Sequence, residues 1–120
     1  MKRLVTLLSA GAVALLLSSG AWAASEAPVT AAQIAAAKTP AEHEAIAAAY
    51  DKEAAQLEAM AKDHESMEKA YKAAAVGQKG NSAAAMGAHC QKLVAEYKAA
   101  AEQNRQLAAE HRQMAKAAGK

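Results

Sequence analysis

Two stretches of the chain carry core-type residues at alternating intervals of three and four. The row in the first stretch consists of His43, Ile46, Tyr50, Glu53, Leu57, Met60, His64, Met67, Tyr71 and Ala74. The row in the second consists of Met86, Cys90, Leu93, Tyr97, Ala100, Asn104, Leu107, His111 and Met114. Such spacing is typical of residues that share one side of a coiled-coil helix. The pattern therefore predicts two long helices that each bury one row of side chains.

The ends of these helices are marked by capping and breaking residues. Thr39, Pro40 and Glu42 form a Thr-Pro-x-Glu start, which combines a capping box with proline at the first helical position. Gly77 and Gly80 break the pattern. We therefore expect an all-α chain with helices over 40–76 and 83–118 and a loop over 77–82. The short loop favours a long antiparallel two-helix hairpin, 40–118, in which Glu53 lies opposite Asn104.

The residues before the hairpin form two further segments. Lys2 and Arg3 precede an apolar run that is too short to span a bilayer comfortably, and Ala21-Trp22-Ala23 matches the small-x-small cleavage rule. We interpret 1–23 as a Sec-type signal peptide, without the cysteine of a lipoprotein. Residues 24–39 are a lead-in, in which Thr30 and Gln33 predict a short helix over 31–38. The sequence thus predicts a periplasmic or secreted protein.

The charge of the mature chain argues against two classes of partner. Removal of Lys2 and Arg3 lowers the number of basic residues from 14 to 12, equal to the 12 acidic residues. A chain with no net charge and no basic stripe lacks the contacts that dominate nucleic-acid binding. The apolar positions are mostly alanine, which suits a membrane surface poorly. We therefore expect neither nucleic acid nor, after signal cleavage, a membrane as partner.

Alanine makes up about a third of the chain and forms stripes beside both rows. The stripes consist of Ala47, Ala54 and Ala61 in the first stretch and of Gly87, Val94, Ala101, Ala108 and Ala115 in the second. They widen the apolar side of each helix beyond what one partner helix can cover. A lone hairpin without Phe also has a thin core. We therefore expect a homodimer that forms a four-helix bundle, or docking onto another periplasmic protein.

Charged residues four apart occupy the remaining sides of both stretches. The pairs are Glu58 with Lys62, Glu65 with Lys69, Glu68 with Lys72, Lys92 with Glu96, and Lys98 with Glu102. This is the spacing of ion pairs along a helix surface. We interpret these charges as a solvated surface.

Sulfur and imidazole side chains gather in two places along the rows. The candidate metal ligands near the loop are Met67, Met86, Cys90, His64 and His89, and a weaker cluster at the open end consists of His43, His111 and Met114. Thiolate, thioether and imidazole are ligands that copper(I) prefers. The clusters therefore indicate copper(I) as the candidate cofactor.

A purely structural interpretation competes with the metal hypothesis. Methionine and reduced cysteine are common core residues, and the chain has no Cys-x-x-Cys, His-x3-His or paired Glu-x-x-His motif. No nucleophile–base pair or phosphate-binding loop indicates an enzyme. The sequence therefore predicts a non-enzymatic exported hairpin that acts by self-association or partner binding. The alternative is a periplasmic copper(I)-binding protein for storage, delivery or tolerance.

Overall fold

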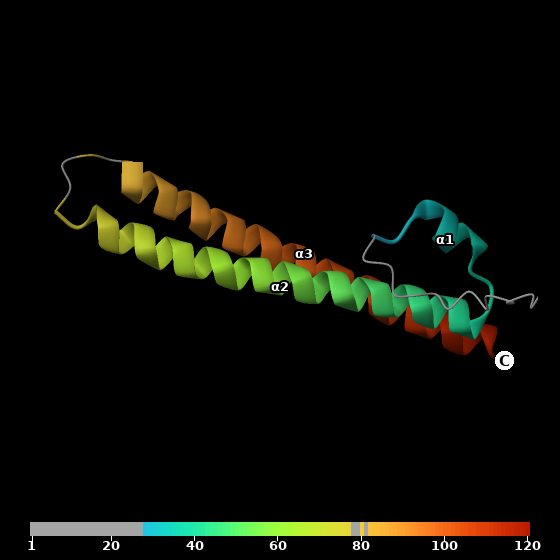
Figure 1. Cartoon of the computed structure of the whole chain (residues 1–120). Coiled ribbons are helices and arrows are strands. Elements are labelled where there is room, and N and C mark those ends of the chain that lie inside the picture. Colours follow the sequence, from blue (N-terminus) through green and yellow to red (C-terminus); the bar gives the residue numbers. More distant parts are fainter. Residues whose placement is uncertain (1–27, 78–79, 81) are drawn as a thin grey trace, which may run out of the picture.

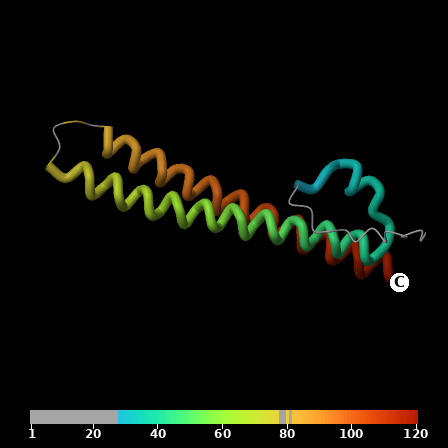
Figure 2. Tube along the Cα trace, in the orientation of Figure 1, coloured from blue at the N-terminus to red at the C-terminus, as the bar shows by residue number. Residues whose placement is uncertain are grey.

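The chain folds into two long antiparallel helices with a short helix at their open end (Figure 1). The computed structural model describes residues 28–77, 80 and 82–120. Helix α1 spans Ala31–Ala36, α2 spans Pro40–Ala75 and α3 spans Ser82–Ala118. The Cα trace shows α2 and α3 side by side over their whole length (Figure 2). The predicted all-α hairpin is confirmed, whereas the predicted signal peptide, 1–23, lies outside the described residues.

Capping boxes begin the first two helices, as the sequence predicts. The hydroxyl of Thr39 accepts a hydrogen bond from the backbone N–H of Glu42, and the Glu42 carboxylate accepts one from the N–H of Thr39. Thr30 and Gln33 make the equivalent pair of bonds at the start of α1. Backbone N–H groups of Lys38 and Thr39 lower the pKa of the Glu42 carboxyl. At the start of each of these helices, the N-cap residue and the residue three positions later thus accept hydrogen bonds from free backbone N–H groups.

Glycines lie at both ends of the hairpin. Val76 ends α2, and Gly77 follows with a φ of 80°, a left-handed conformation that glycine adopts without strain. At the other end, Gly119 lies beside Pro40, and a Cβ placed on Gly119 would be 3.5 Å from the proline Cγ. The residue that follows α3 therefore packs against the first residue of α2.

The alanine stripes lie at the centre of the interface between the helices. We call these residues the central stripe: Ala47, Ala54 and Ala61 of α2 with Gly87, Val94, Ala101, Ala108 and Ala115 of α3, all buried. The sequence prediction put the larger side chains there instead and the alanines beside them. Small side chains at the centre let the helix backbones approach closely, which displaces the larger residues to the sides. No large side chain in the described part of the chain is fully buried.

The predicted pairing of Glu53 with Asn104 does not form as a hydrogen bond. The Asn104 amide donates to the Ala100 carbonyl one turn earlier in α3, at 3.0 Å. Both side chains are half-buried, beside the central stripe rather than within it. Water therefore reaches Glu53, and this carboxylate does not need an amide partner across the interface.

Candidate functional site

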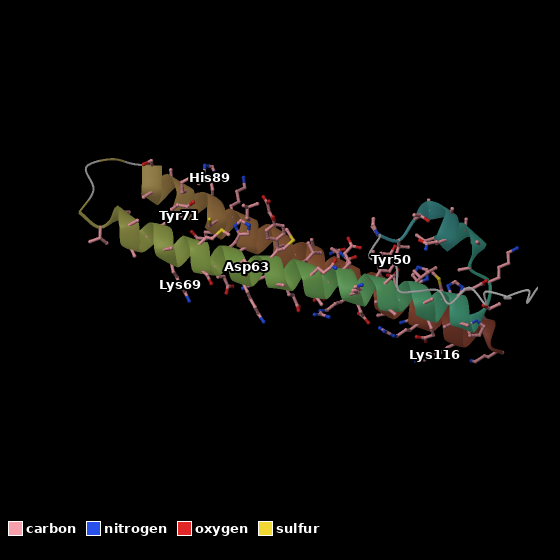
Figure 3. All side chains as sticks on the ribbon, viewed as in Figure 1. Tyr50, Asp63, Lys69, Tyr71, His89 and Lys116 are labelled. Carbon is pink, nitrogen blue, oxygen red and sulfur yellow. The ribbon has the colours of Figure 1, made fainter. Side chains whose placement is uncertain are left out.

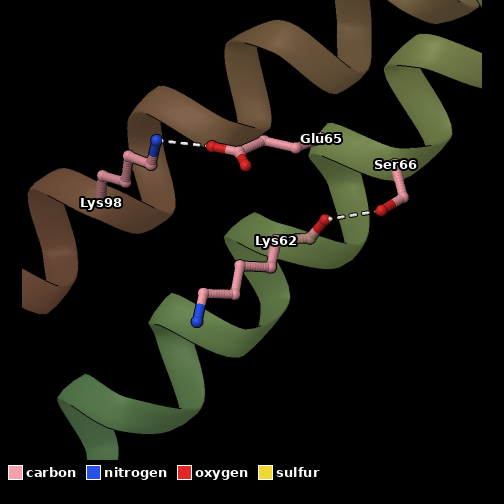
Figure 4. Close-up of polar contacts among 4 residues, drawn as sticks. All are labelled: Lys62, Glu65, Ser66 and Lys98. Atoms are coloured by element: carbon pink, nitrogen blue, oxygen red, sulfur yellow. Dashed lines mark hydrogen bonds and ion pairs between the residues drawn. The ribbon is translucent and has the colours of Figure 1, made fainter.

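One side of the hairpin carries a ladder of ion pairs between the helices, which we call the charged flank. Lys98 lies 2.5 Å from Glu65, Arg105 lies 2.6 Å from Glu58, and Arg112 lies 2.6 Å from Asp51. Each step of seven residues along α3 matches a step of seven backwards along α2. Figure 4 shows Lys98 of α3 reaching Glu65 of α2, while Ser66 bonds the backbone of Lys62. Two of the three acids of the charged flank, Glu58 and Glu65, are therefore ones that the sequence pattern assigns to pairs along one helix.

Of the five predicted pairs four residues apart, one forms in the described residues. Lys72 contacts Glu68, whereas Glu58 and Glu65 bind basic residues of the facing helix. The Lys98 ammonium, by hydrogen bond and by charge, lowers the pKa of the Glu65 carboxyl. Contacts of this kind lie at the surface, so salt screens them.

The opposite side of the hairpin carries large apolar side chains, which we call the methionine row. Each ion-pair residue of the charged flank comes four positions after a central-stripe residue. Each row residue comes one position before a central-stripe residue, except Met67, which lies seven residues after Met60. These two positions lie on opposite sides of the stripe on each helix. Since the ion pairs place the first kind together, the second kind also share one side. The methionine row consists of Met60 and Met67 of α2 and Met86, Leu107 and Met114 of α3.

Solvent reaches the whole methionine row. The exposed fractions of these five residues lie between 39% and 47%, although the sequence pattern predicted that they point inward. Leu93 and Ala100 continue the row on α3 and are half-buried. Exposed apolar side chains that line one side of a molecule are a common feature of interaction sites. The row runs along the full hairpin, from Met86 near the loop to Met114 at the open end.

A row of ring-bearing and polar side chains lies between the central stripe and the methionine row. At the open end of the hairpin, two histidines of this row lie against each other. The Nδ1 atoms of His43 and His111 are 3.1 Å apart, and the ring centroids are separated by 5.4 Å. The ring of Tyr50 lies against His111, with centroids 5.8 Å apart. His111 is 5% exposed, and burial, followed by the charge of His43, lowers the pKa of its imidazole. The structure thus brings together His43 and His111 of the predicted open-end cluster.

A further histidine, His64, lies three heptads after His43 on α2, nearer the loop. The ring of His64 lies against Tyr97, with centroids 5.4 Å apart. Its Nδ1 is the one buried side-chain nitrogen or oxygen without a hydrogen-bond partner among the described residues. Cys90, free and buried, stands three heptads before His111, as His64 stands three heptads after His43. His64 and Cys90 therefore hold matching positions on facing helices.

The other predicted ligands point to the surface. Met67 and Met86 belong to the methionine row, as does Met114 of the open-end cluster. His89 is exposed on the side of α3 that faces away from α2 (Figure 3). Its position therefore separates it from Cys90 despite their adjacency in sequence. Among the described residues, no three His, Cys, Asp or Glu side chains are grouped as they would be around a metal ion.

Comparisons with known proteins add no functional assignment. No family model matches the chain, and neither the curated proteins nor the solved structures contain a match to it. Within the described residues, none of the helices has an apolar stretch long enough to cross a bilayer. The charged flank, the methionine row and the two histidine positions are therefore the features on which a function can be proposed.

Proposed function

We propose that the protein is an exported, non-enzymatic helical hairpin that acts by pairing with a second copy of itself through the methionine row. The observation that carries this proposal is the exposure of five large apolar side chains on one side of the hairpin. The product would be a four-helix bundle, with two helices from each copy.

The composition of the row favours a second copy over a different partner. On this side of the hairpin α2 carries Glu53, Met60, Met67 and Ala74, and α3 carries Met86, Leu93, Ala100, Leu107 and Met114, each set spaced by seven; Ile46, in the same register, is already buried within the hairpin. Eight of these nine exposed or half-buried side chains are apolar, so apolar residues meet apolar residues when the row is turned about a two-fold axis. A self-complementary surface of this kind is what a closed dimer requires.

The rest of the molecule leaves this side as the one available for pairing. The basic side chains of the charged flank on α3 already pair with acidic side chains on α2, so a second copy would have to break those ion pairs to dock there. The outer faces of both helices carry Lys and Glu. The methionine row is therefore the only large side of the described hairpin that gains from losing water.

Pairing also supplies burial that one hairpin lacks. The core consists of alanines, one valine, one isoleucine and one cysteine. Complete burial of a Met or Leu side chain contributes about 1.5–3 kcal/mol, and a row residue still exposes somewhat less than half of its surface. Each row residue would then add about 1 kcal/mol on dimerisation. Methionine adapts its shape to an opposing surface, which suits such an interface.

Sedimentation equilibrium at micromolar concentration tests the proposal. We expect the wild type to sediment as a dimer and a Met60→Lys, Leu107→Lys variant as a folded monomer. Ala55→Lys is the matched control, because this residue is exposed on the outer part of α2. Retention of the dimer in the row variant, or a monomeric wild type, would contradict the proposal.

Export is proposed from the first residues alone. The basic start, the apolar run and Ala21-Trp22-Ala23 support cleavage after Ala23. Intact-mass measurement of the protein recovered from the periplasm or medium tests this proposal. We expect a mature chain that begins at Ala24, and an uncleaved chain retained in the cytoplasm would contradict export.

Copper(I) binding is the second candidate function, and one observation favours it. The buried Nδ1 of His64 has no partner, and the buried thiol of Cys90 stands in the matching position of the facing helix. Met67 follows His64 by three residues and Met86 precedes Cys90 by four, so both thioethers lie one turn from this pair. A thiolate, an imidazole and thioethers form a soft ligand set.

Competition for copper(I) against a chelator tests this second candidate. Cys90→Ser and His64→Ala should each weaken binding at least tenfold, whereas His89→Ala should leave it unchanged because His89 faces away. Equal affinity in the wild type and Cys90→Ser would remove the hypothesis.

A further inference from the structure

The open end of the hairpin holds two imidazoles that present the same atom to each other. His43 comes from the first turn of α2 and His111 from the end of α3, and their Nδ1 atoms are 3.1 Å apart. A neutral imidazole has one nitrogen that donates and one that accepts. A single proton between the two Nδ1 atoms therefore satisfies both atoms, and an ion that lies off the line between them could bind both in place of that proton.

We infer that His43 and His111 form a chelating site for a divalent transition-metal ion that joins the two helix ends. The ligands come from different helices and stand 68 residues apart in the chain. Imidazole suits zinc, copper and nickel ions. Binding would therefore occur in the folded hairpin and not in the unfolded chain.

The separation of the two nitrogens favours a divalent ion over linear copper(I). Zinc lies about 2.0–2.1 Å from an imidazole nitrogen, so an ion bound to two nitrogens 3.1 Å apart makes an angle of about 95–102° with them. This angle lies between the octahedral and tetrahedral values. A linear two-coordinate ion would instead need nitrogens about 4 Å apart. A divalent ion therefore fits the separation of His43 and His111 better than the copper(I) expected from the sequence for the His43, His111 and Met114 cluster.

The surroundings keep His111 ready to bind a metal. This side chain is 5% exposed and packs against Tyr50, so its ring is held in place. His43 is half-buried at the edge of the hairpin, so solvent gives an ion access to the pair. Water would fill the remaining coordination positions, with the Met114 thioether one turn beyond His111 as a further neighbour.

Zinc binding measured by equilibrium dialysis tests the inference, because Zn²⁺ does not oxidise the thiol. A Cys90→Ser background removes sulfur as a ligand. We expect one Zn²⁺ per chain at neutral pH and at least tenfold weaker binding in His43→Ala and in His111→Ala. His89→Ala is the matched control and should bind like its parent, because this histidine faces away from α2.

A second readout separates binding from folding. Zinc should raise the melting temperature of the parent and leave that of His43→Ala unchanged, since an ion that binds the native state stabilises it. Circular dichroism reports whether the variants keep their helices. Equal zinc affinity in the parent and His43→Ala, or no binding by the parent, would overturn the inference.

Zinc binding does not require the dimer. A Met60→Lys, Met67→Lys variant, which changes the methionine row only on α2, should bind zinc like the wild type, because both positions lie more than four turns along α2 from His43. Failure of dimerisation and failure of the metal site are therefore distinguishable.

Discussion

Gly87 of α3 faces Tyr71 of α2 at van der Waals distance. A Cβ placed on Gly87 would lie 3.6 Å from the Cβ of Tyr71 and 3.8 Å from the carbonyl oxygen of Glu68. The backbone of α3 therefore passes within one methyl group of α2 near the loop. This close approach continues along the central stripe, where the residues that separate the helices are mostly alanine.

Gly87→Ala should stabilise the hairpin. The space accepts one methyl group at ordinary contact distances, and replacing a helix-interior glycine by alanine contributes about 0.5–1 kcal/mol. Urea unfolding measures the change. Gly87→Leu should instead lower stability, because the larger side chain would push against the backbone of α2. A loss of stability in Gly87→Ala would contradict the close but unstrained packing.

Neighbouring alanines of α3 should respond differently to leucine. Ala108 is fully buried in the central stripe, and Ala109 is exposed. Ala108→Leu should lower the free energy of unfolding by about 1–3 kcal/mol, since overpacking forces the helices apart. Ala109→Leu should change it by less than about 0.5 kcal/mol. Similar losses in both variants would show that the stripe is not the interface.

The charged flank should align the helices rather than supply most of their stability. Glu58→Lys places like charges together, because Arg105 lies 2.6 Å from Glu58. This variant should melt below the wild type at low salt, and Glu58→Lys, Arg105→Glu should recover most of the loss. Both effects should shrink in high salt. A loss that the double variant fails to recover would indicate that the two residues do not pair.

Stability should fall as the pH decreases below about 6.5, the ordinary pKa of histidine. Burial and the charge of His43 lower the pKa of His111, so the unfolded chain binds more protons than the folded chain between the lowered value and 6.5. Urea unfolding at several pH values measures the slope. In His111→Gln the slope over this window should be smaller, whereas His89→Gln should keep it. An unchanged slope in His111→Gln would contradict the assignment.

The helix ends could be predicted because they depend on residues that are close together in the sequence. Thr39, Pro40 and Glu42 satisfy the N-terminal backbone of α2, and Gly77 ends this helix, so both ends depend on neighbours in sequence. The helix bounds differ from the expected ones by one residue at each side of the loop. The pairing of the rows also follows, because a short loop leaves antiparallel packing as the simple arrangement.

The centre of the interface could not be predicted from residue size alone. A pattern that ranks Met60 above Ala61 by hydrophobicity puts the larger residue inside. In the structure the smaller residue lies at the interface, because it lets the two helix backbones approach closely. One row of α2 is then exposed, and Met60 and Met67 become surface residues. The spacing of seven in the alanines, continued by Gly87 and Val94, was the available signal.

The candidate sites depend on contacts between helices, so they were only partly predictable. His43 and His111 meet because the open ends align, and this alignment follows from the hairpin. The spacing i, i+3 and i+4 groups His89 with Met86 and Cys90, although one residue along a helix turns the side chain by about 100° and so separates His89 from Cys90. The charged flank was missed because Glu58 and Glu65 each also have a lysine four residues later in the same helix.

Methionine oxidation tests the central claim most directly. The four methionines after the predicted signal peptide, Met60, Met67, Met86 and Met114, all belong to the methionine row, so mild peroxide treatment followed by mass spectrometry reports on this surface alone. We predict rapid oxidation of all four in dilute protein and marked protection of all four at concentrations where the dimer forms. Equal oxidation rates at low and high protein concentration would contradict the claim that a second copy covers this row.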